Sequence, residues 1–211
     1  MTSNTRNHMS PNSQNLHGSV PEECAVTLLM IDVINDLEFE GGDKLLRYAL
    51  PAAKKIAQLK HRAKQLGIPV VYINDNFGKW QSDFRKLVAH CLNDGVRGEA
   101  VARLLVPDED DYFILKPKHS GFYSTTLDLL LEYLRAETLI LTGLTSDVCV
   151  LFTANDAYLR DFRLIIPSDC GAAIDPEDHQ YALRQMQRVL KADIRPSMEL
   201  DLKKLKQRQC L

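Results

Sequence analysis

The sequence predicts an α/β fold: a three-layer, doubly wound, mostly parallel sheet with helices on both faces. Two observations carry this prediction. Short apolar runs alternate along the chain with longer helical stretches, which is the element order of a parallel sheet with helical crossovers. The short runs are apolar at consecutive positions, as in strands that are covered on both faces.

The expected elements follow one another in a regular order. The first expected helix, at 46–66, has a clear end, because Gly67 follows it and Pro69 opens the next strand. The stretch from Phe77 to Asp111 is less regular; it has room for one or two short helices, and insertions of this kind supply substrate-facing loops. Strands are expected at 25–32, 69–74, 113–116, 139–142 and 163–167, and helices at 46–66, 84–92, 126–134, 149–160 and 181–190.

The length and composition predict one domain with two short extensions. A chain of 211 residues with 45% hydrophobic side chains can bury the core of a single domain, which we expect at residues 23–200. Residues 1–22 are rich in Ser, Asn, Thr and His and offer little to bury, which predicts a flexible N-terminal arm. Residues 201–211 are expected to form a basic C-terminal tail, either a frayed helix or an irregular segment.

The charge balance favours a small-molecule partner. With 26 basic and 28 acidic side chains the formal net charge is −2, so the chain has no electrostatic footprint for nucleic acid or for an anionic membrane. No apolar stretch approaches the roughly 20 residues that span a bilayer, and the first 20 residues lack the apolar core of a secretory signal. We therefore expect a cytoplasmic protein. The five cysteines are widely spaced without a CxxC pair, which fits neither a disulfide framework nor a zinc knuckle.

One cysteine lies where a strand is expected to pass into a helix. The stretch 143–150 (GLTSDVCV) follows the apolar run 138–142 and precedes the helical pattern at 151–160. In an open α/β sheet this edge binds ligands, and the N–H groups of a helix N-terminus favour negative charge. The same field is expected to lower the pKa of the Cys149 thiol.

Two charged residues end other expected strands. Asp32 follows the apolar run 27–31, and Lys116 follows the run 112–115. A buried acid or amine needs a partner, and the two would satisfy each other at one sheet edge. A catalytic cysteine needs a base, a neighbour that holds charge, and donors for the oxyanion. Considered alone, Cys149 could equally be an inert core residue, and Asp32 could be a helix N-cap.

Three segments together resemble a known family. Residues 30–36 (MIDVIND), 115–122 (LKPKHSGF) and 143–150 resemble the isochorismatase-like cysteine hydrolases, which include nicotinamidases, N-carbamoylsarcosine amidohydrolases and biuret or ureidoacrylate amidohydrolases. The likeness covers roughly residues 25–197. It implies the isochorismatase-like form of the doubly wound fold, no cofactor, and a homo-oligomer, either dimer or tetramer.

The resemblance also implies roles for the site residues. Asp32 would act as general base, Lys116 would hold the charges of the aspartate and the thiolate, and Cys149 would attack the carbonyl to form a thioester that water cleaves. Lys118 lies on the same face of an extended segment as Lys116, and the match to the family motif alone selects Lys116. The Leu144–Thr145 peptide would be cis, and the backbone N–H groups of Thr145 and Cys149 would form the oxyanion hole.

Two departures from the family pattern narrow the function. Nicotinamidases bind a metal through an Asp and paired histidines, whereas here Asp75 is followed by Asn76, Phe77 and Gly78, with no histidine before His90. This predicts that no metal is bound and makes nicotinamidase activity unexpected. Ile34 also replaces a glutamine that many members carry, which changes a neighbour of Asp32 but not its role.

The sequence therefore predicts a metal-independent cysteine hydrolase that cleaves a C–N bond of a small amide, ureide or lactam. Trp80, Phe122 and Tyr123 are candidates for the pocket wall, because aromatic faces suit planar amides. Two alternatives stay open. One is vinyl-ether hydrolysis of the isochorismatase type, without a covalent step. The other is a non-catalytic binding or assembly module of the same fold.

Overall fold

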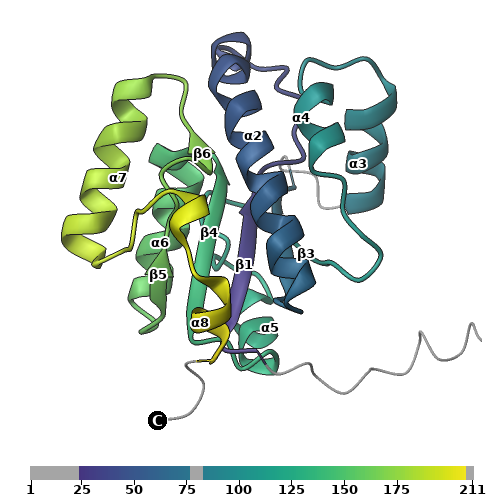
Figure 1. The fold of residues 1–211 in the computed structure, drawn as a ribbon. Coiled ribbons are helices and arrows are strands. Elements are labelled where there is room, and N and C mark those ends of the chain that lie inside the picture. Colours follow the sequence, from purple (N-terminus) through teal and green to yellow (C-terminus); the bar gives the residue numbers. More distant parts are fainter. Residues whose placement is uncertain (1–23, 77–82, 208–211) are drawn as a thin grey trace, which may run out of the picture.

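The computed structural model describes residues 24–76 and 83–207, which form one sheet with helices on both sides (Figure 1). The strands run in the order β3-β2-β1-β4-β5, with β6 pairing to β4, and every strand pair is parallel. The predicted α/β fold is confirmed. The strands are β1 (Val26–Ile31), β2 (Val70–Asp75), β3 (Tyr112–Lys116), β4 (Thr138–Leu144), β5 (Arg163–Ile165) and β6 (Gly171–Ala172).

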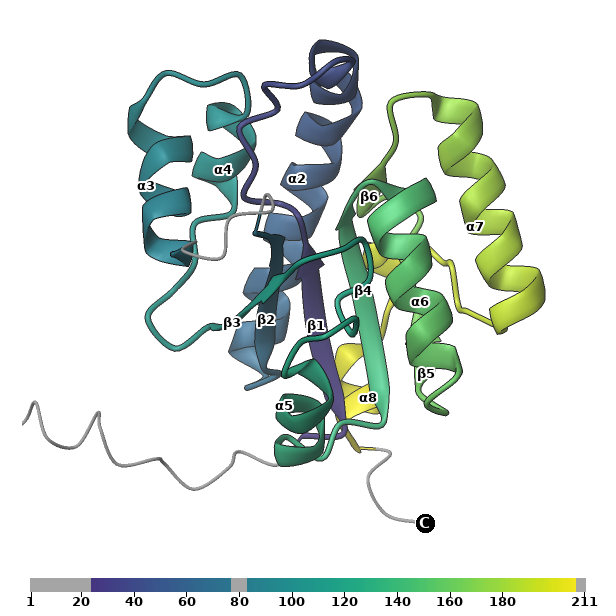
Figure 2. The same ribbon diagram turned by 180° about the vertical axis from the view of Figure 1, so that it is seen from behind.

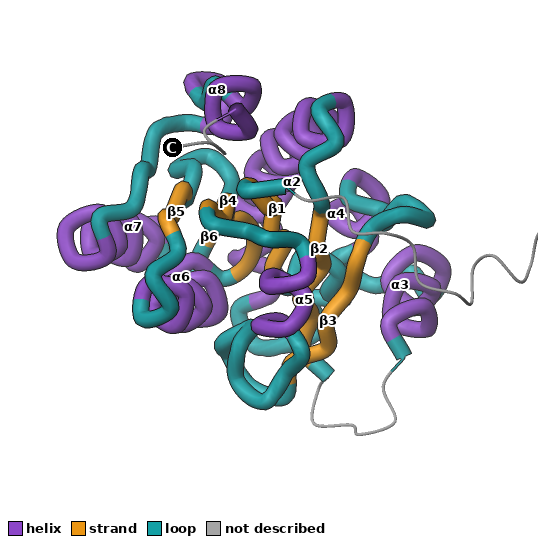
Figure 3. Tube along the Cα trace, turned by 90° about the horizontal axis from the view of Figure 1, so that it is seen from below, coloured by secondary structure: helices purple, strands orange, loops and turns teal. Residues whose placement is uncertain are grey.

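The helices form two layers, one on each face of the sheet (Figures 2 and 3). One layer holds α2, α3, α4 and α8, and the other holds α5, α6 and α7. The strand order reverses between β1 and β4, which is the point at which an open α/β sheet opens a crevice for ligands. The helices are α2 (Gly42–Gln65), α3 (Phe84–Asn93), α4 (Glu99–Leu104), α5 (Leu127–Tyr133), α6 (Leu151–Tyr158), α7 (Pro176–Leu190) and α8 (Leu202–Gln207).

The central strand β1 shows why the strands are apolar at consecutive positions. Its side chains alternate between two hydrophobic clusters: Leu28 and Met30 pack with α2, whereas Leu29 and Ile31 pack with α5, α6 and α7. All four are fully buried. A strand covered on both faces has no polar side, and β2 and β4 repeat the pattern.

Two helices begin earlier than the apolar periodicity predicts. Helix α7 begins at Pro176 instead of Tyr181, because Asp175 caps it by accepting the Glu177 N–H and the proline occupies the first turn. Helix α2 begins at Gly42, after Gly41 turns the chain with a φ of 82°. Strand β6 has only two residues and was not predicted. Cap and turn residues, which lie outside the apolar pattern, set these boundaries.

Of the two expected extensions, the C-terminal one is helical over most of its described length. The predicted tail at 201–211 contains helix α8, whose Leu202 is buried and whose Lys206 donates a hydrogen bond to the Leu66 carbonyl. The leucines of this segment recur at helical spacing, which lets it dock on α2. The predicted arm at 1–22 lies outside the described residues. Among the described helices, none is long and apolar enough to cross a membrane.

A buried lysine ties α2 to the segment before β3. Lys60 Nζ lies 2.7 Å from Asp111 Oδ2 and 3.0 Å from Asp108 Oδ2, and it donates to Tyr72 Oη and to the Val106 carbonyl, each at 3.0 Å. The Asp111 side chain is 1% exposed. The ammonium therefore compensates a carboxylate that is removed from water.

Replacing this lysine should destabilise the fold without touching the sheet's ligand-binding edge. We expect Lys60→Ala to lower the free energy of unfolding by about 3 kcal/mol, because Asp111 stays buried and keeps only Lys64 as a cationic partner. Lys54→Ala, at an exposed position of the same helix, should change it by less than about 0.5 kcal/mol. Urea denaturation measures both. Equal losses in the two variants would contradict the assignment.

Candidate active site

Three groups from distant parts of the chain meet at the carboxyl ends of the strands. Asp32 directly follows β1, Lys116 ends β3, and Cys149 lies in a π-helical turn, Ser146–Val150, after β4. Lys116 Nζ is 2.8 Å from Asp32 Oδ2 and 3.6 Å from Cys149 Sγ. The structure thus brings together the acid, the amine and the thiol that the sequence singled out.

The pairing of β2 with β1 and β3 fixes the carboxylate and the amine. The Asp32 N–H donates to the Ile73 carbonyl at 2.8 Å, and the Asp75 N–H donates to Asp32 Oδ1, also at 2.8 Å. Asp75 is paired in register with Lys116 in the parallel ladder. The Lys116 side chain is fully buried, whereas Lys118 is exposed. Burial therefore distinguishes the two lysines, which the residue pattern alone did not.

A second carboxylate borders the cluster. Asp75 Oδ2 lies 3.6 Å from Lys116 Nζ, and its side chain is 32% exposed. A metal held by Asp75 would sit close to this ammonium, which repels a cation. The next residue is Asn76, and His90 instead contacts Asp94 at 2.7 Å. The described residues at this position therefore do not fit a metal site of the nicotinamidase type.

Burial and charge set the protonation state of the cluster. Burial raises the pKa of the Asp32 carboxyl above 3.8, while the Lys116 ammonium and hydrogen bonds from Cys149 and Asp75 oppose the rise. For Lys116, burial disfavours the ammonium, but its attraction to the Asp32 carboxylate, with further contributions from Cys149 and Asp75, raises its pKa above 10.5. Burial raises the pKa of Cys149 to about 12, helped by Asp32 and opposed by Lys116. The resting state therefore holds a neutral thiol beside an ion pair.

This thiol differs from the expectation that a helix N-terminus lowers its pKa. Helix α6 begins only at Leu151, two residues after Cys149, so the thiol precedes the helix and lies in the π-helical turn. Its burial and the neighbouring Asp32 carboxylate outweigh any effect of the helix. The raised pKa favours the neutral thiol over the thiolate at neutral pH.

The turn that carries Cys149 follows a close approach of two strands. Gly143 has a φ of 120°, and a Cβ at this position would lie 2.0 Å from the Ile31 carbonyl oxygen, so no larger residue fits. The Leu144–Thr145 peptide bond is cis. The Thr145 carbonyl then accepts the N–H groups of Val148 and Val150, at 3.3 and 3.1 Å, which closes the turn.

A buried threonine links the loop after β3 to the turn. The Thr153 hydroxyl accepts the Gly121 N–H at 3.0 Å and donates to the Cys149 carbonyl at 2.7 Å. Ser120, in the loop after β3, donates its hydroxyl hydrogen to Asp156, which lies on helix α6 as Thr153 does. These contacts hold the loop that follows Lys116 against helix α6, which begins beside the thiol.

Two of the three predicted pocket-wall residues, Phe122 and Tyr123, lie in the described part of the chain. Phe122 is 4% exposed; its ring centroid lies 6.2 Å from that of Phe162 and 4.6 Å from the Arg160 guanidinium carbon, beyond the far end of α6 from Cys149. Phe122 is therefore a core residue. Tyr123 is 56% exposed, and Trp80 lies outside the described residues.

Sequence reasoning did not predict a contact between two aromatic rings from the elements that carry Lys116 and Cys149. Phe152, three residues after Cys149, is 53% exposed, and its ring centroid lies 5.5 Å from that of His119. The pair joins the loop after β3 to the first turn of α6. An exposed phenylalanine on a helix of mixed polarity gives no periodic signal that would have identified it.

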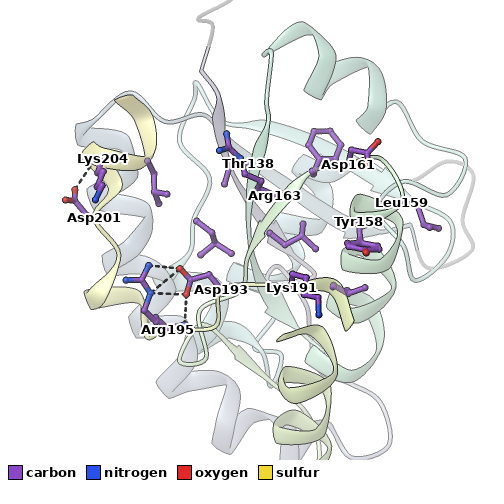
Figure 4. A pocket seen from close by; sticks show the side chains of 15 residues that line it. Thr138, Tyr158, Leu159, Asp161, Arg163, Lys191, Asp193, Arg195, Asp201 and Lys204 are labelled. Carbon is purple, nitrogen blue, oxygen red and sulfur yellow. Dashed lines mark hydrogen bonds and ion pairs between the residues drawn. The ribbon is translucent and has the colours of Figure 1, made fainter. Parts of the chain in front are cut away.

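The open cavity shown in Figure 4 is not at this cluster. It has a volume of about 790 Å³ and is lined by Thr138 and Arg163, the first residues of β4 and β5, together with Asp201 and Lys204 near α8. It therefore lies at the opposite edge of the sheet from Cys149. Asp108, Asp110 and Asp111 lie close together before β3, also away from Lys116, and contact Lys60 and Lys64.

The sequence of the whole domain matches a known family. The family model for the isochorismatase domain matches residues 26–193. The chain belongs to the isochorismatase family. The isochorismatase family protein YaaI of Bacillus subtilis is 42% identical over 167 residues, which cover 79% of this chain and 91% of that protein. The protein is accordingly an isochorismatase-family hydrolase.

Solved structures of amidases share the fold. The N-carbamoylsarcosine amidase of Thermoplasma acidophilum is 30% identical, with a TM-score of 0.62 over 83% of this chain and 98% of that one. The pyrazinamidase/nicotinamidase of Streptococcus mutans is 28% identical, with a TM-score of 0.64 over 80% of this chain and 99% of that one. The isochorismatase-family hydrolase described here thus has amidases among its structural neighbours.

Asp32 should control the acidity of the Cys149 thiol. We expect Asp32→Asn to lower the pKa of Cys149, because the substitution removes the negative charge that helps to raise it. The pH dependence of alkylation by iodoacetamide, followed on the Cys149 peptide by mass spectrometry, measures this pKa.

A matched control is Asp128→Asn, which removes an exposed carboxylate paired with Arg160. It should leave the alkylation profile of Cys149 unchanged. A Cys149 pKa that stays the same or rises in Asp32→Asn would contradict the electrostatic arrangement.

Proposed function

We propose that the protein is a metal-independent cysteine hydrolase that cleaves a C–N bond of a small amide, ureide or lactam through a thioester intermediate. The contact of Lys116 Nζ with both Asp32 and Cys149 Sγ carries this proposal. The amidases among the structural neighbours support the substrate class.

Asp32 serves as the base in the first step. Its raised pKa makes it a stronger base than an ordinary aspartate, and the thiol is hydrogen-bonded to it. As the Cys149 sulfur bonds to the substrate carbonyl carbon, the S–H proton passes to Asp32 and the carbonyl oxygen becomes an oxyanion. The N–H groups of Thr145 and Cys149 stabilise that charge, each donor contributing about 3 kcal/mol.

The tetrahedral intermediate then collapses to a thioester, which water cleaves. The C–N bond breaks, and the proton held by Asp32 moves to the leaving nitrogen. A water molecule then attacks the thioester carbonyl while Asp32 takes one of its protons. The C–S bond breaks, and Asp32 returns the proton to the sulfur. Lys116 stays charged throughout, because its pKa lies above 10.5, and stabilises the sulfur whenever it carries negative charge.

The neutral thiol favours this mechanism over a resting thiolate. With the pKa of Cys149 near 12, little thiolate exists at neutral pH, so attack has to be coupled to proton transfer. The carboxylate form of Asp32 is the active one. Activity should therefore fall as the pH drops through the Asp32 pKa, at a midpoint above 3.8.

Removal of the sulfur tests the proposal. With a panel of amides, ureides and lactams, Cys149→Ala should lower kcat at least about 10³-fold, because the covalent step is lost. The matched control Cys91→Ala removes a buried thiol of α3 and should keep turnover.

Trapping separates this proposal from its alternatives. Rapid acid quenching followed by intact mass spectrometry should add the acyl mass to the wild-type protein, on the peptide that carries Cys149. Turnover of a vinyl ether with no adduct would favour isochorismatase-type hydrolysis. Absence of any turnover, with Cys149 no more reactive than Cys91, would favour a binding module.

A further inference from the structure

A histidine from α7 contacts the turn that carries the thiol. His179 Nδ1 lies 2.8 Å from Ser146 Oγ, and His179 Nε2 lies 3.1 Å from the Ser168 carbonyl oxygen. Ser146 is the first residue of the π-helical turn, and Ser168 lies between β5 and β6. One imidazole therefore joins three segments: helix α7, the turn at 146–150 that carries Cys149 (the nucleophile turn), and the segment between β5 and β6.

The carbonyl partner determines which way these hydrogen bonds run. The Ser168 carbonyl can only accept, so Nε2 carries the proton and donates to it. Nδ1 is then an acceptor, and the Ser146 hydroxyl donates to it. Donation by the Ser146 hydroxyl requires the neutral imidazole, because the Nδ1–H of a protonated His179 would instead donate to Ser146 Oγ.

Space for the serine hydroxyl is provided by a glycine. Ser146 is 2% exposed, and a Cβ on Gly171 would lie 2.7 Å from its Oγ. The other atoms near that Cβ position are at 3.3 Å or more. Any side chain on Gly171 would displace the hydroxyl from His179, so β6 is shaped around this hydrogen bond.

We propose that His179 is a positioning residue that acts through Ser146 to hold the nucleophile turn in its reactive conformation. The inference rests on the proposed thiol chemistry at Cys149. Ser146 directly follows Thr145 and lies three residues before Cys149. The backbone N–H groups of Thr145 and Cys149 are the proposed oxyanion donors. A turn that shifts would misplace both donors at once.

The charges around the imidazole favour its neutral form. Burial lowers the pKa of His179 below 6.5, while the Ser168 carbonyl and the Asp147 carboxylate of the turn oppose this shift. The backbone N–H of His179 donates to the backbone carbonyl of Asp175, which caps α7, so the Asp175 carbonyl does not contact the ring. As the pH drops through the pKa of His179, Nδ1 gains a proton and donates to Ser146 Oγ, so the hydrogen bond reverses. The buried Ser146 O–H then loses its acceptor, and kcat should fall.

Substitutions that keep or remove the acceptor provide the test. Ser146→Ala and His179→Gln should each lower kcat about 10- to 100-fold, because small misplacements of reacting groups have effects of this size. KM should change less than about twofold, since the oxyanion forms only in the transition state. The Gln amide can occupy the place of Nε2, but it leaves Ser146 without an acceptor.

The conservative variant should rescue the loss. The side-chain oxygen of His179→Asn occupies the place of Nδ1, so it can accept from Ser146, and kcat should return to within about threefold of wild type. Its pH profile should also lose the contribution of the histidine to the acid limb. His61→Gln, at an exposed position of α2, is the matched control and should match wild type.

Gly171 allows an independent check. Gly171→Ala alone should lower kcat about tenfold, because the added methyl group displaces the Ser146 hydroxyl. In the Ser146→Ala background that hydroxyl is absent, and the same substitution should change kcat less than twofold. Equal effects in both backgrounds would overturn the proposal.

A readout that needs no substrate keeps the two proposals distinguishable. Hydrogen exchange of the amides at 144–150 should accelerate at least tenfold in Ser146→Ala and His179→Gln, but not in His179→Asn. If the wild type forms no acyl adduct, the proposed function fails, and hydrogen exchange still decides the role of His179. If both variants keep wild-type kcat and exchange, the positioning role is wrong.

Discussion

The ion pair between Lys116 and Asp32 is the constraint on which the rest of the site depends. An ammonium that is fully buried must be paired, because an isolated buried charge is far too costly. Asp32 provides the partner at 2.8 Å, and Asp75 and the thiol lie at 3.6 Å. The pair in turn sets the acidity of the sulfur: the carboxylate raises the pKa of Cys149 and the ammonium opposes the rise.

The order of the strands makes this ion pair possible. Lys116 and Asp32 lie on strands separated by β2, and the Asp75 N–H at the end of β2 hydrogen-bonds to Asp32. Cys149 enters from β4, on the other side of β1. The three groups therefore converge where the strand order reverses. Thr153 and His179 then fix the turn from helices α6 and α7, so both the sheet and the helical layer behind it contribute to the geometry.

Much of the fold and the centre of the site could be predicted from sequence, for a physical reason. A charged residue directly after a run of four or five apolar ones marks a buried strand end, and parallel strands bring such ends to one edge; Asp32 and Lys116 were recognised in this way. The protonation state of the Cys149 thiol could not be predicted, because it depends on burial and on a π-helical turn that precedes the helix. Phe122 packs in a buried cluster, and the sequence could not have shown this, because an aromatic residue in a loop near the site fits a pocket wall and a core equally well.

Other features left no signal in the apolar pattern. His179 and Ser146 are 33 residues apart and meet only through the packing of α7 on the turn. The start of α7 was missed because its cap, Asp175, precedes the amphipathic part of the helix. Polar contacts between elements depend on tertiary arrangement, and periodicity within one element does not report them.

The protonation of Lys116 is the measurement that tests the central claim most directly. Protein labelled with ¹⁵N at the lysine side chains allows the Nζ resonance of Lys116 to be followed with pH by NMR and assigned by comparison with Lys116→Arg. The account predicts that Lys116 stays charged to above pH 10.5, and that this pKa falls in Asp32→Asn, where burial acts without the carboxylate. A Lys116 that loses its proton below pH 10.5 in the wild type, or that is unaffected by the loss of Asp32, would contradict it.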